Sequence, residues 1–351
     1  MKKLSLRAWL SIVTVILIAI VLFFSRHELE HAWQLIGQAT LWWLLLIIPL
    51  TAMSYMTEGE MAFSFLRQKK LIQGVSPFKL MRISFEMNFV NHILPSGGVS
   101  GISYGNWRMG KLGVTTGKAT MAQLIRYAAG FGATIVLLIV SVLIVTLDEG
   151  LNRWMVLSSS TLVSLMIIAT LLGMYLFKSQ TRTLKFSGFV TKTINMIIRK
   201  VTFGKVSRLL KRAKVDEFFD EMHDDYRLIV REKKLLLRPF LWGLAFTAIG
   251  ILQFFVAFMA LGEVVNPAAI LIGYSLASLA GFAVATPGGM GAYEAVFVAV
   301  LGIFGVKSGI GIAGILLARI VILLTTIGIG YVFYQLALIK HGKRASDILG
   351  Q

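Results

Sequence analysis

The feature that most constrains this chain is a series of long segments that are almost free of charge. Six such blocks stand out: Trp9–Phe24, Leu41–Ser54, Ala119–Leu147, Met155–Phe177, Pro239–Leu261 and Gly309–Ile339. Several exceed the roughly 20 residues that an α-helix needs to cross about 30 Å of hydrocarbon. A core helix of a soluble protein is rarely so long and so uniformly apolar. We therefore expect an all-α polytopic membrane protein, with about six to eight transmembrane helices.

The distribution of charge supports this interpretation. Only 15% of the 351 residues are charged, against roughly 25% in a typical soluble domain. Much of the net charge of +18 lies in residues 178–238, which contain 16 Lys/Arg and 7 Asp/Glu. The remaining basic residues lie mainly in short connections beside apolar blocks, as the positive-inside rule predicts for cytoplasmic loops. A nucleic-acid partner is not expected, because there is no soluble basic module with base-stacking aromatic residues.

The ends of the chain are predicted to be cytoplasmic. Lys2, Lys3 and Arg7 precede the first apolar block, as they do in a signal peptide. No small-residue cleavage site follows Phe24, so we expect a retained first helix that starts on the cytoplasmic side of the cell membrane. Basic residues again follow the last apolar block, at Lys340 and beyond.

These patterns divide the chain into four parts. Residues 1–177 form an N-terminal membrane half, and residues 178–238 form a basic cytoplasmic loop. Within that loop, residues 201–230 alternate apolar and charged residues at helical spacing, which predicts amphipathic helices on the inner membrane surface. Residues 239–340 form a C-terminal membrane half, and residues 341–351 form a cytoplasmic tail.

Each membrane half contains an apolar hairpin that is broken by proline and glycine. The limbs of the hairpin at 83–107 are about a dozen residues long, too short to span, and both of its flanks are basic. We expect a re-entrant hairpin buried inside the protein, because non-helical backbone is not tolerated against lipid. The limbs of the hairpin at 268–306 are about 17 residues long and can just span. The charges of the flanking loops leave open whether this second segment is re-entrant or crosses twice, because both paths return the chain to the outer side.

The two breaks resemble each other. The first is Asn91–Tyr104 and the second is Ala285–Glu294, and each contains proline, a glycine pair, a further glycine and tyrosine. The hairpins are expected to open from opposite sides, which predicts an inverted-topology repeat with substrate bound near the midplane. The helix that restarts after each break presents N–H groups and a positive dipole end to a phosphate. The alternative is that such breaks serve only packing.

Ionisable side chains within apolar segments are costly and usually face the interior or a cavity. Seven are candidates here: Glu58, Glu60, Glu86, His92, Arg126, Glu294 and Arg319. Glu294 lies one turn after the second break, and Arg126 and Arg319 lie within otherwise apolar helices. These arginines either bind a lipid phosphate or form structural ion pairs, for example with Glu294.

The predicted substrate-binding residues combine the two breaks with the two arginines. They are Asn91, Pro95, Gly97, Gly98, Ser100, Gly101, Tyr104, Arg126, Pro287, Gly288, Gly289, Gly291, Tyr293, Glu294 and Arg319. No catalytic residue, cofactor or metal is expected. The chain lacks cysteine, phosphate-binding loops and hydrolase motifs. His27 and His31 have the spacing of a helical metal pair but fit an exposed outer helix better.

Two segments carry a further resemblance. Asn88–Gly98 together with Thr286–Glu294 resembles the transmembrane region of lysylphosphatidylglycerol synthases, also described as a flippase-like family. The resemblance covers essentially the whole chain. It implies binding and translocation of an anionic or aminoacylated phospholipid such as lysyl-phosphatidylglycerol, and an association with resistance to antimicrobial peptides.

The resemblance also implies a soluble domain that transfers lysine from tRNA. Here the chain ends about ten residues after Lys340, so we expect no such domain and no lysyl transfer by this chain alone. The alternatives are that the chain is the membrane component of a lysyltransferase system with a separate synthase partner, or a scaffold that does not transport. A homodimer is a further expected form. The lipid, the direction of movement and the energy source are not predicted.

Overall fold

The computed structural model describes residues 39–94, 99–147, 178–201, 231–283 and 291–341, together with residue 37 and isolated residues within 157–176 and 212–227. This part of the chain is all-helical, which confirms the predicted fold class. Four of its helices are long and apolar enough to cross a membrane: α3 (Leu41–Gln68), α6 (Thr116–Leu147), α10 (Lys234–Ala260) and α13 (Ser308–His341). Two other expected spans, at 8–24 and 155–177, lie wholly or mostly outside the described residues.

Four shorter helices flank the two predicted breaks. Helices α4 (Pro77–Ile93) and α5 (Val99–Gly110) surround the first, and α11 (Pro267–Ala283) and α12 (Ala292–Ile303) surround the second. In each hairpin the first helix has 17 residues and the second has 12, or about 25 and 18 Å of helix. The first hairpin is longer than its predicted bounds of 83–107, because Ser76 caps α4 and accepts a hydrogen bond from the Lys79 N–H.

The helices repeat in the same order in the two halves of the chain. A long helix, a 17-residue helix, a 12-residue helix and a second long helix occur as α3–α4–α5–α6 and again as α10–α11–α12–α13. The first long helices have 28 and 27 residues and the last have 32 and 34. The Thr40 N–H donates to the Ala260 carbonyl, so the start of α3 meets the end of α10 and the two helices run in opposite directions.

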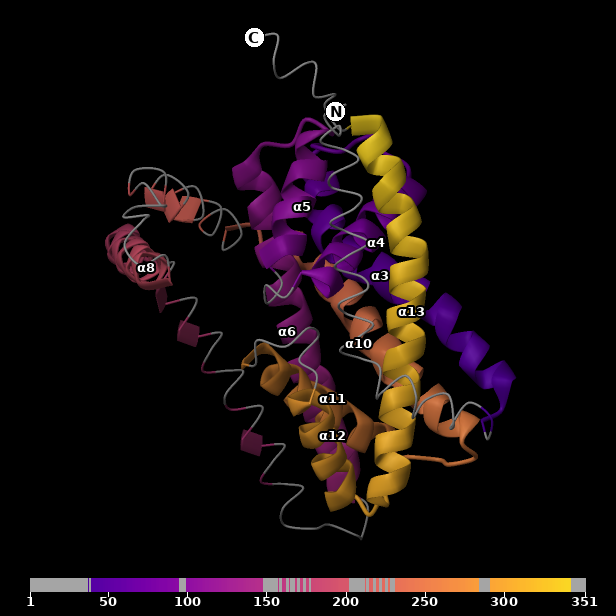
Figure 1. Cartoon of the computed structure of the whole chain (residues 1–351). Coiled ribbons are helices and arrows are strands. Elements are labelled where there is room, and N and C mark those ends of the chain that lie inside the picture. The colour runs from indigo at the N-terminus through magenta and orange to yellow at the C-terminus, as the bar shows by residue number, and fades with distance from the viewer. Residues whose placement is uncertain are drawn as a thin grey trace.

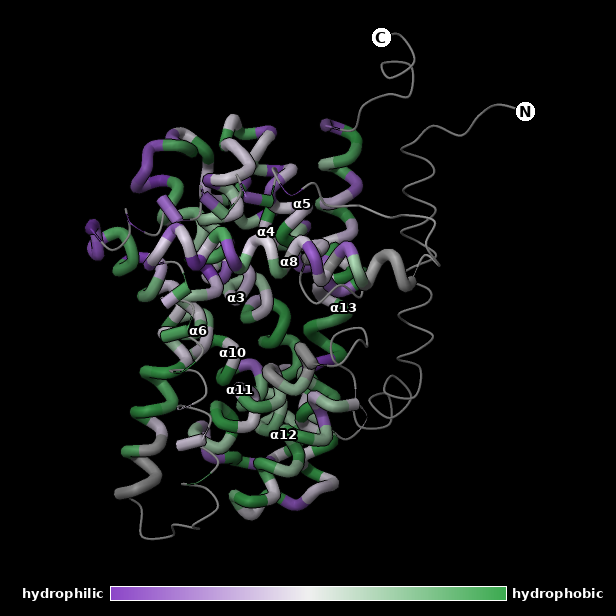
Figure 2. The backbone as a smooth tube through the Cα atoms, turned by 90° about the vertical axis from the view of Figure 1, so that its left-hand side faces the viewer, coloured by the Kyte–Doolittle hydropathy of each residue, from purple (hydrophilic) through white to green (hydrophobic). Residues whose placement is uncertain are grey.

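Because α3 and α10 run in opposite directions, the two hairpins lie at opposite ends of the helix bundle. Figure 1 shows α4 and α5 in the upper half and α11 and α12 in the lower half, while α13 runs the full height. Neither α11 nor α12 reaches the level of α4 and α5 in Figure 1 or Figure 2, so this hairpin turns back within the bundle. The arrangement agrees with the inverted repeat that the two similar breaks predict.

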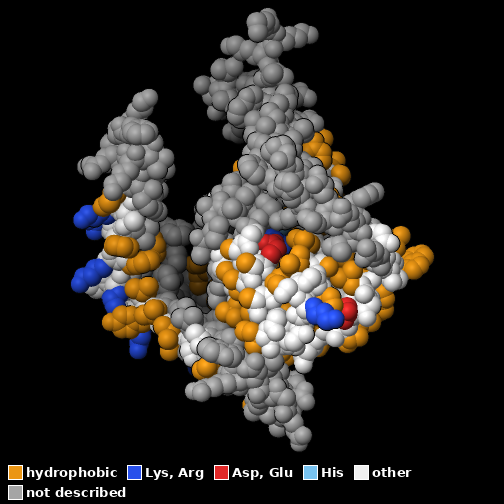
Figure 3. Space-filling view, turned by 60° about the horizontal axis from the view of Figure 1, so that its bottom comes forward, with side chains coloured by type: hydrophobic (Ala, Val, Ile, Leu, Met, Phe, Trp, Pro, Cys, Tyr) orange, Lys and Arg blue, Asp and Glu red, His pale blue; other side chains and the backbone are white. Residues whose placement is uncertain are grey.

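We call the two ends of the bundle the basic end and the opposite end. At the basic end, His341 lies within electrostatic range of Lys79, Lys111 and Lys340. Figure 2 shows hydrophilic residues concentrated in this upper part of the molecule and hydrophobic residues below. The opposite end carries few charges: Figure 3 shows mainly hydrophobic and uncharged atoms there, with Lys and Arg gathered on the separate limb at the left.

That limb is α8 (Gln180–Val201). It packs against the segment at 212–227, where Phe186 contacts Phe219 edge-on and the Ser187 hydroxyl donates to Asp216. Its exposed side combines Phe189 with Lys185 and other basic residues. The amphipathic helices predicted for residues 201–230 lie mostly outside the described residues, and the helix that precedes them has this amphipathic character.

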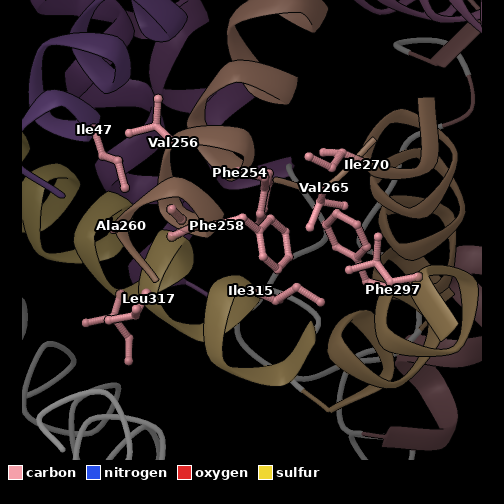
Figure 4. Packing of buried hydrophobic residues seen from close by; sticks show 14 of the residues in the cluster. Ile47, Phe254, Val256, Phe258, Ala260, Val265, Ile270, Phe297, Ile315 and Leu317 are labelled. Atoms are coloured by element: carbon pink, nitrogen blue, oxygen red, sulfur yellow. The ribbon is translucent and has the colours of Figure 1, made fainter. Parts of the chain in front are cut away.

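Two large hydrophobic clusters hold the bundle together, one at each end, and a smaller third cluster joins α6 to α11 and α12. The cluster at the basic end joins the end of α3 to α4, α5, α6 and the start of α10, and includes Leu66, Leu80, Met109, Ile125 and Leu235. The cluster at the opposite end joins the start of α3 to α10, α11, α12 and α13. Figure 4 shows Phe254, Phe258, Phe297, Ile315 and Leu317 packed in it. Polar side chains lie between the two clusters, in the middle of the long helices.

Candidate functional site

The first ion pair of this middle layer joins α3 to α6. Arg126 Nη1 donates to Glu58 Oε1 at 2.6 Å, and the second carboxylate oxygen of Glu58 accepts from Asn88 Nδ2 of α4, also at 2.6 Å. The Arg126 side chain is 5% exposed and that of Glu58 is 16% exposed. The arginine also stacks on the ring of Tyr127, with its guanidinium carbon 4.8 Å from the ring centroid. Three helices of the N-terminal half therefore meet at Glu58.

The second ion pair joins α12 to α13. Glu294 binds Arg319 through Oε1 and accepts the Gly291 N–H through Oε2 at 2.7 Å. Arg319 stacks on Tyr293, with its guanidinium carbon 4.5 Å from the ring centroid. The Glu294–arginine pair that the sequence suggested is therefore present, and Arg319 is its partner.

The two arginines occupy equivalent places in the repeat. Arg126 is the eleventh residue of α6, counted from Thr116, and Arg319 is the twelfth residue of α13, counted from Ser308. Each follows a broken hairpin, pairs with a glutamate of its own half and stacks on a tyrosine. Because the halves run in opposite directions, the two ion pairs approach the middle of the bundle from opposite ends.

Further polar side chains connect the two pairs. The ring of His92, near the end of α4, lies within electrostatic range of both Glu58 and Arg319. On the C-terminal side, Ser278 Oγ donates to the Tyr274 backbone carbonyl at 2.7 Å, and the hydroxyls of Tyr274 and Tyr293 lie within electrostatic range of each other. We call this set the central polar cluster: Glu58, Asn88, His92, Arg126, Tyr274, Ser278, Tyr293, Glu294 and Arg319.

The restarting helices are capped by side chains of the protein itself. Asn91 Oδ1 accepts the Gly101 N–H at 2.7 Å, two residues into α5. Ser100 Oγ donates to the same oxygen at 3.3 Å. At α12, the oxygen of Glu294 that accepts the Gly291 N–H has the corresponding role. In this structure the positive helix ends are thus partly neutralised by an amide and a carboxylate, and a headgroup that binds there has to replace these side chains.

Other predicted residues are placed elsewhere or lie outside the described part of the chain. Tyr104 donates to Glu86 Oε2 at 3.0 Å, in a network with Arg108 towards the basic end. Pro95, Gly97, Gly98, Pro287, Gly288 and Gly289 lie outside the described residues.

Sequence reasoning missed several functional contacts. Arg108 reads as a flanking charge of a cytoplasmic loop, yet its side chain is 4% exposed and pairs with Glu86 at 2.5 and 3.2 Å. Asn88 was not singled out, because a neutral amide in an apolar segment gives no charge signal. Glu58 is one of the seven ionisable candidates but not one of the predicted substrate-binding residues, and the structure shows that it joins three helices.

The geometry can be compared with known proteins. The profile of the family described as "Lysylphosphatidylglycerol synthase TM region" matches residues 9–330. This chain belongs to that family. The match includes both hairpins and every residue of the central polar cluster. A search of curated proteins finds no match to this member of the lysylphosphatidylglycerol synthase transmembrane family.

Proposed function

We propose that this chain binds the headgroup of an anionic or aminoacylated phospholipid in the central polar cluster and moves the lipid between the leaflets of the cell membrane. One arrangement carries the proposal. Two glutamate–arginine pairs, whose arginines occupy equivalent helices of the repeat, lie beside broken hairpins that enter from opposite ends, with His92 in electrostatic range of one member of each pair. The description of the family, which refers to lysylphosphatidylglycerol, supports a phospholipid as the substrate.

The chemistry of the cluster suits a headgroup that carries both signs of charge. Arginine recognises phosphate by paired N–H donors, and a carboxylate accepts hydrogen bonds from an ammonium group. A lysyl-phosphatidylglycerol headgroup offers a phosphate and ammonium groups. It can therefore exchange partners with Glu58–Arg126 or Glu294–Arg319. Such an exchange leaves no buried charge unpaired, and an unpaired buried charge is the costly alternative.

The inverted repeat supplies a route for alternating access. In transporters built from such repeats, one repeat moves against the other around a fixed site. Here the first pair joins two long helices and binds Asn88 of the first hairpin, while the second pair joins the second hairpin to α13. Movement of a hairpin therefore exposes the pair beside it to one side of the membrane. The positive-inside rule places the basic end in the cytoplasm, and a lipid made in the inner leaflet enters from there.

Leaflet-resolved translocation in proteoliposomes tests the proposal. The assay compares lysyl-phosphatidylglycerol with phosphatidylglycerol, for the unmodified protein, Glu294→Gln and Glu58→Gln. Glu263→Gln is the matched control, because Glu263 is an exposed acid in the loop after α10. We expect the unmodified protein and the control to accelerate lipid movement between the leaflets. In both cluster variants this rate should be at least about tenfold lower, because each loses a charge-assisted contact.

The other functions predict different results. A membrane component of a lysyltransferase system gives no acceleration by itself, but supports lipid aminoacylation when charged tRNA and a synthase partner are added. A scaffold gives neither activity. Absence of acceleration with either lipid, in well-folded protein, contradicts translocation.

A further inference from the structure

A second candidate site lies between α3 and α10, apart from the central polar cluster. A cavity of about 480 Å³ is lined by Ser64 and Arg67 of α3 and by Arg238, Leu241, Trp242 and Ala245 of α10. It lies near the basic end, where Gln68 Nε2 donates to the Leu235 carbonyl at 3.3 Å and joins the end of α3 to the start of α10.

The cavity carries excess positive charge. Arg67 forms an ion pair with Glu60, while Arg238 is close enough to Arg67 for the two like charges to interact. Within the described ranges, no carboxylate pairs with Arg238. In the described part of the chain, one glutamate thus pairs with one of the two arginines, which leaves one positive charge at the cavity without an ion-pair partner there. An anion of single charge satisfies this balance.

A buried hydroxyl provides an independent sign of a ligand. Ser64 is 3% exposed, and its Oγ has no hydrogen-bond partner in the part of the chain that the structure describes. A buried polar atom without a partner is uncommon in folded proteins and costs free energy. Ser64 also lines the cavity, so a ligand oxygen there can accept its hydrogen bond.

The remaining walls are apolar and open towards lipid. Leu241 is 53% exposed and the neighbouring Leu237 is 58% exposed, as expected for a helix surface that faces acyl chains. Trp242 lies beside Arg238 at the level of the basic end, where an indole often marks the headgroup region. A ligand here meets cationic and hydroxyl donors next to a hydrocarbon surface.

We propose that this cavity binds the phosphodiester of an anionic phospholipid, held by Arg67 and Arg238 and accepting a hydrogen bond from Ser64. The acyl chains lie along Leu237 and Leu241. Among the described residues that line the cavity there is no acid to bind an ammonium group, and the nearby Glu60 is already held by Arg67. Phosphatidylglycerol is therefore preferred over phosphatidylcholine. The bound lipid joins α3 to α10, the first helices of the two repeats. This role is independent of the proposed translocation.

Native mass spectrometry of the full chain in mixed phosphatidylglycerol–phosphatidylcholine nanodiscs tests the site. We expect a retained phosphatidylglycerol adduct, and about tenfold weaker retention in Arg238→Ala. Arg231→Ala is the matched control, because Arg231 is exposed, lies seven positions earlier and does not line the cavity. Equal retention in Arg238→Ala and the control overturns the proposal. Loss of the adduct in the presence of millimolar inorganic phosphate overturns the assignment to a lipid.

A second variant separates binding from folding. Ser64→Ala removes a buried hydroxyl that has no partner, so the delipidated variant should melt no lower than the unmodified protein. Its rise in melting temperature on adding phosphatidylglycerol should nevertheless be smaller. An unchanged rise contradicts the role of Ser64. Glu294→Gln should disrupt the proposed translocation but keep the phosphatidylglycerol adduct. Lipid binding in this cavity and translocation through the central polar cluster can therefore fail independently.

Discussion

Glu294 holds α12 and α13 together at one point, by capping its own helix with one carboxylate oxygen and binding Arg319 with the other. The Arg126–Glu58 pair in the first half uses its acid in a similar way, since Glu58 also accepts a hydrogen bond from Asn88. In both halves a glutamate that contacts two protein groups holds an arginine in the middle of the bundle. These contacts lead to the following predictions.

Removal of one partner from the first pair should destabilise the protein strongly. Arg126→Ala leaves Glu58 largely buried without its cation, and we expect a loss of about 3–5 kcal/mol in the free energy of unfolding. The double variant Arg126→Ala/Glu58→Gln should recover part of this loss, because no buried charge remains unpaired. Denaturant unfolding in detergent measures both. If the double variant is no more stable than the single one, the pair is not the source of the effect.

The close approach of α13 to α4 should make Gly330 intolerant of a side chain. A Cβ at Gly330 lies 2.6 Å from Phe89 Cβ and 3.2 Å from the Phe85 carbonyl oxygen, so the helices must separate. We expect Gly330→Ala to cost about 1–3 kcal/mol. Gly328→Ala, on the same helix with open space around it, should be neutral or stabilise by up to about 1 kcal/mol. Equal melting temperatures for the two variants contradict this packing.

The start of α12 should depend on glycine at position 291 for its backbone conformation. Gly291 has φ of 88°, which side chains on L-residues disfavour by about 1–2 kcal/mol. We expect Gly291→Ala to lower stability by that amount. Gly302 lies in the same helix with nothing near its Cβ position and no positive φ, so Gly302→Ala serves as the control. Thermal unfolding in detergent compares them, and an equally stable Gly291→Ala is the contradicting result.

The cap on α5 should contribute a smaller amount of stability. Asn91→Ala removes the oxygen that accepts the Gly101 N–H, and loss of such a cap typically costs about 1 kcal/mol. Asn91→Asp keeps an oxygen that accepts the Gly101 N–H at the start of α5, so it should preserve the cap itself. Hydrogen exchange at the start of α5 reports the cap directly. Unchanged exchange in Asn91→Ala indicates that other contacts hold the hairpin.

The sequence by itself determined the membrane class and the repeat. Long apolar blocks can only be buried in lipid or in other helices, so the four long helices follow from local composition. Proline and glycine interrupt a helix wherever they occur together, so both breaks could be located without the fold. The equivalence of Arg126 and Arg319 also follows from their similar distances to the two breaks.

Only the tertiary structure decided which charges meet. The partners of Glu58 are 30 and 68 positions away along the chain, and such separations leave no periodic signal in a sequence. Arg108 shows the limit most clearly: the same residue type that marks a cytoplasmic loop is here buried against Glu86. The physical reason is that hydrophobic burial fixes the helices locally, whereas ion pairing depends on how the helices are rotated against one another. That rotation is set by close contacts such as Gly330 against Phe89.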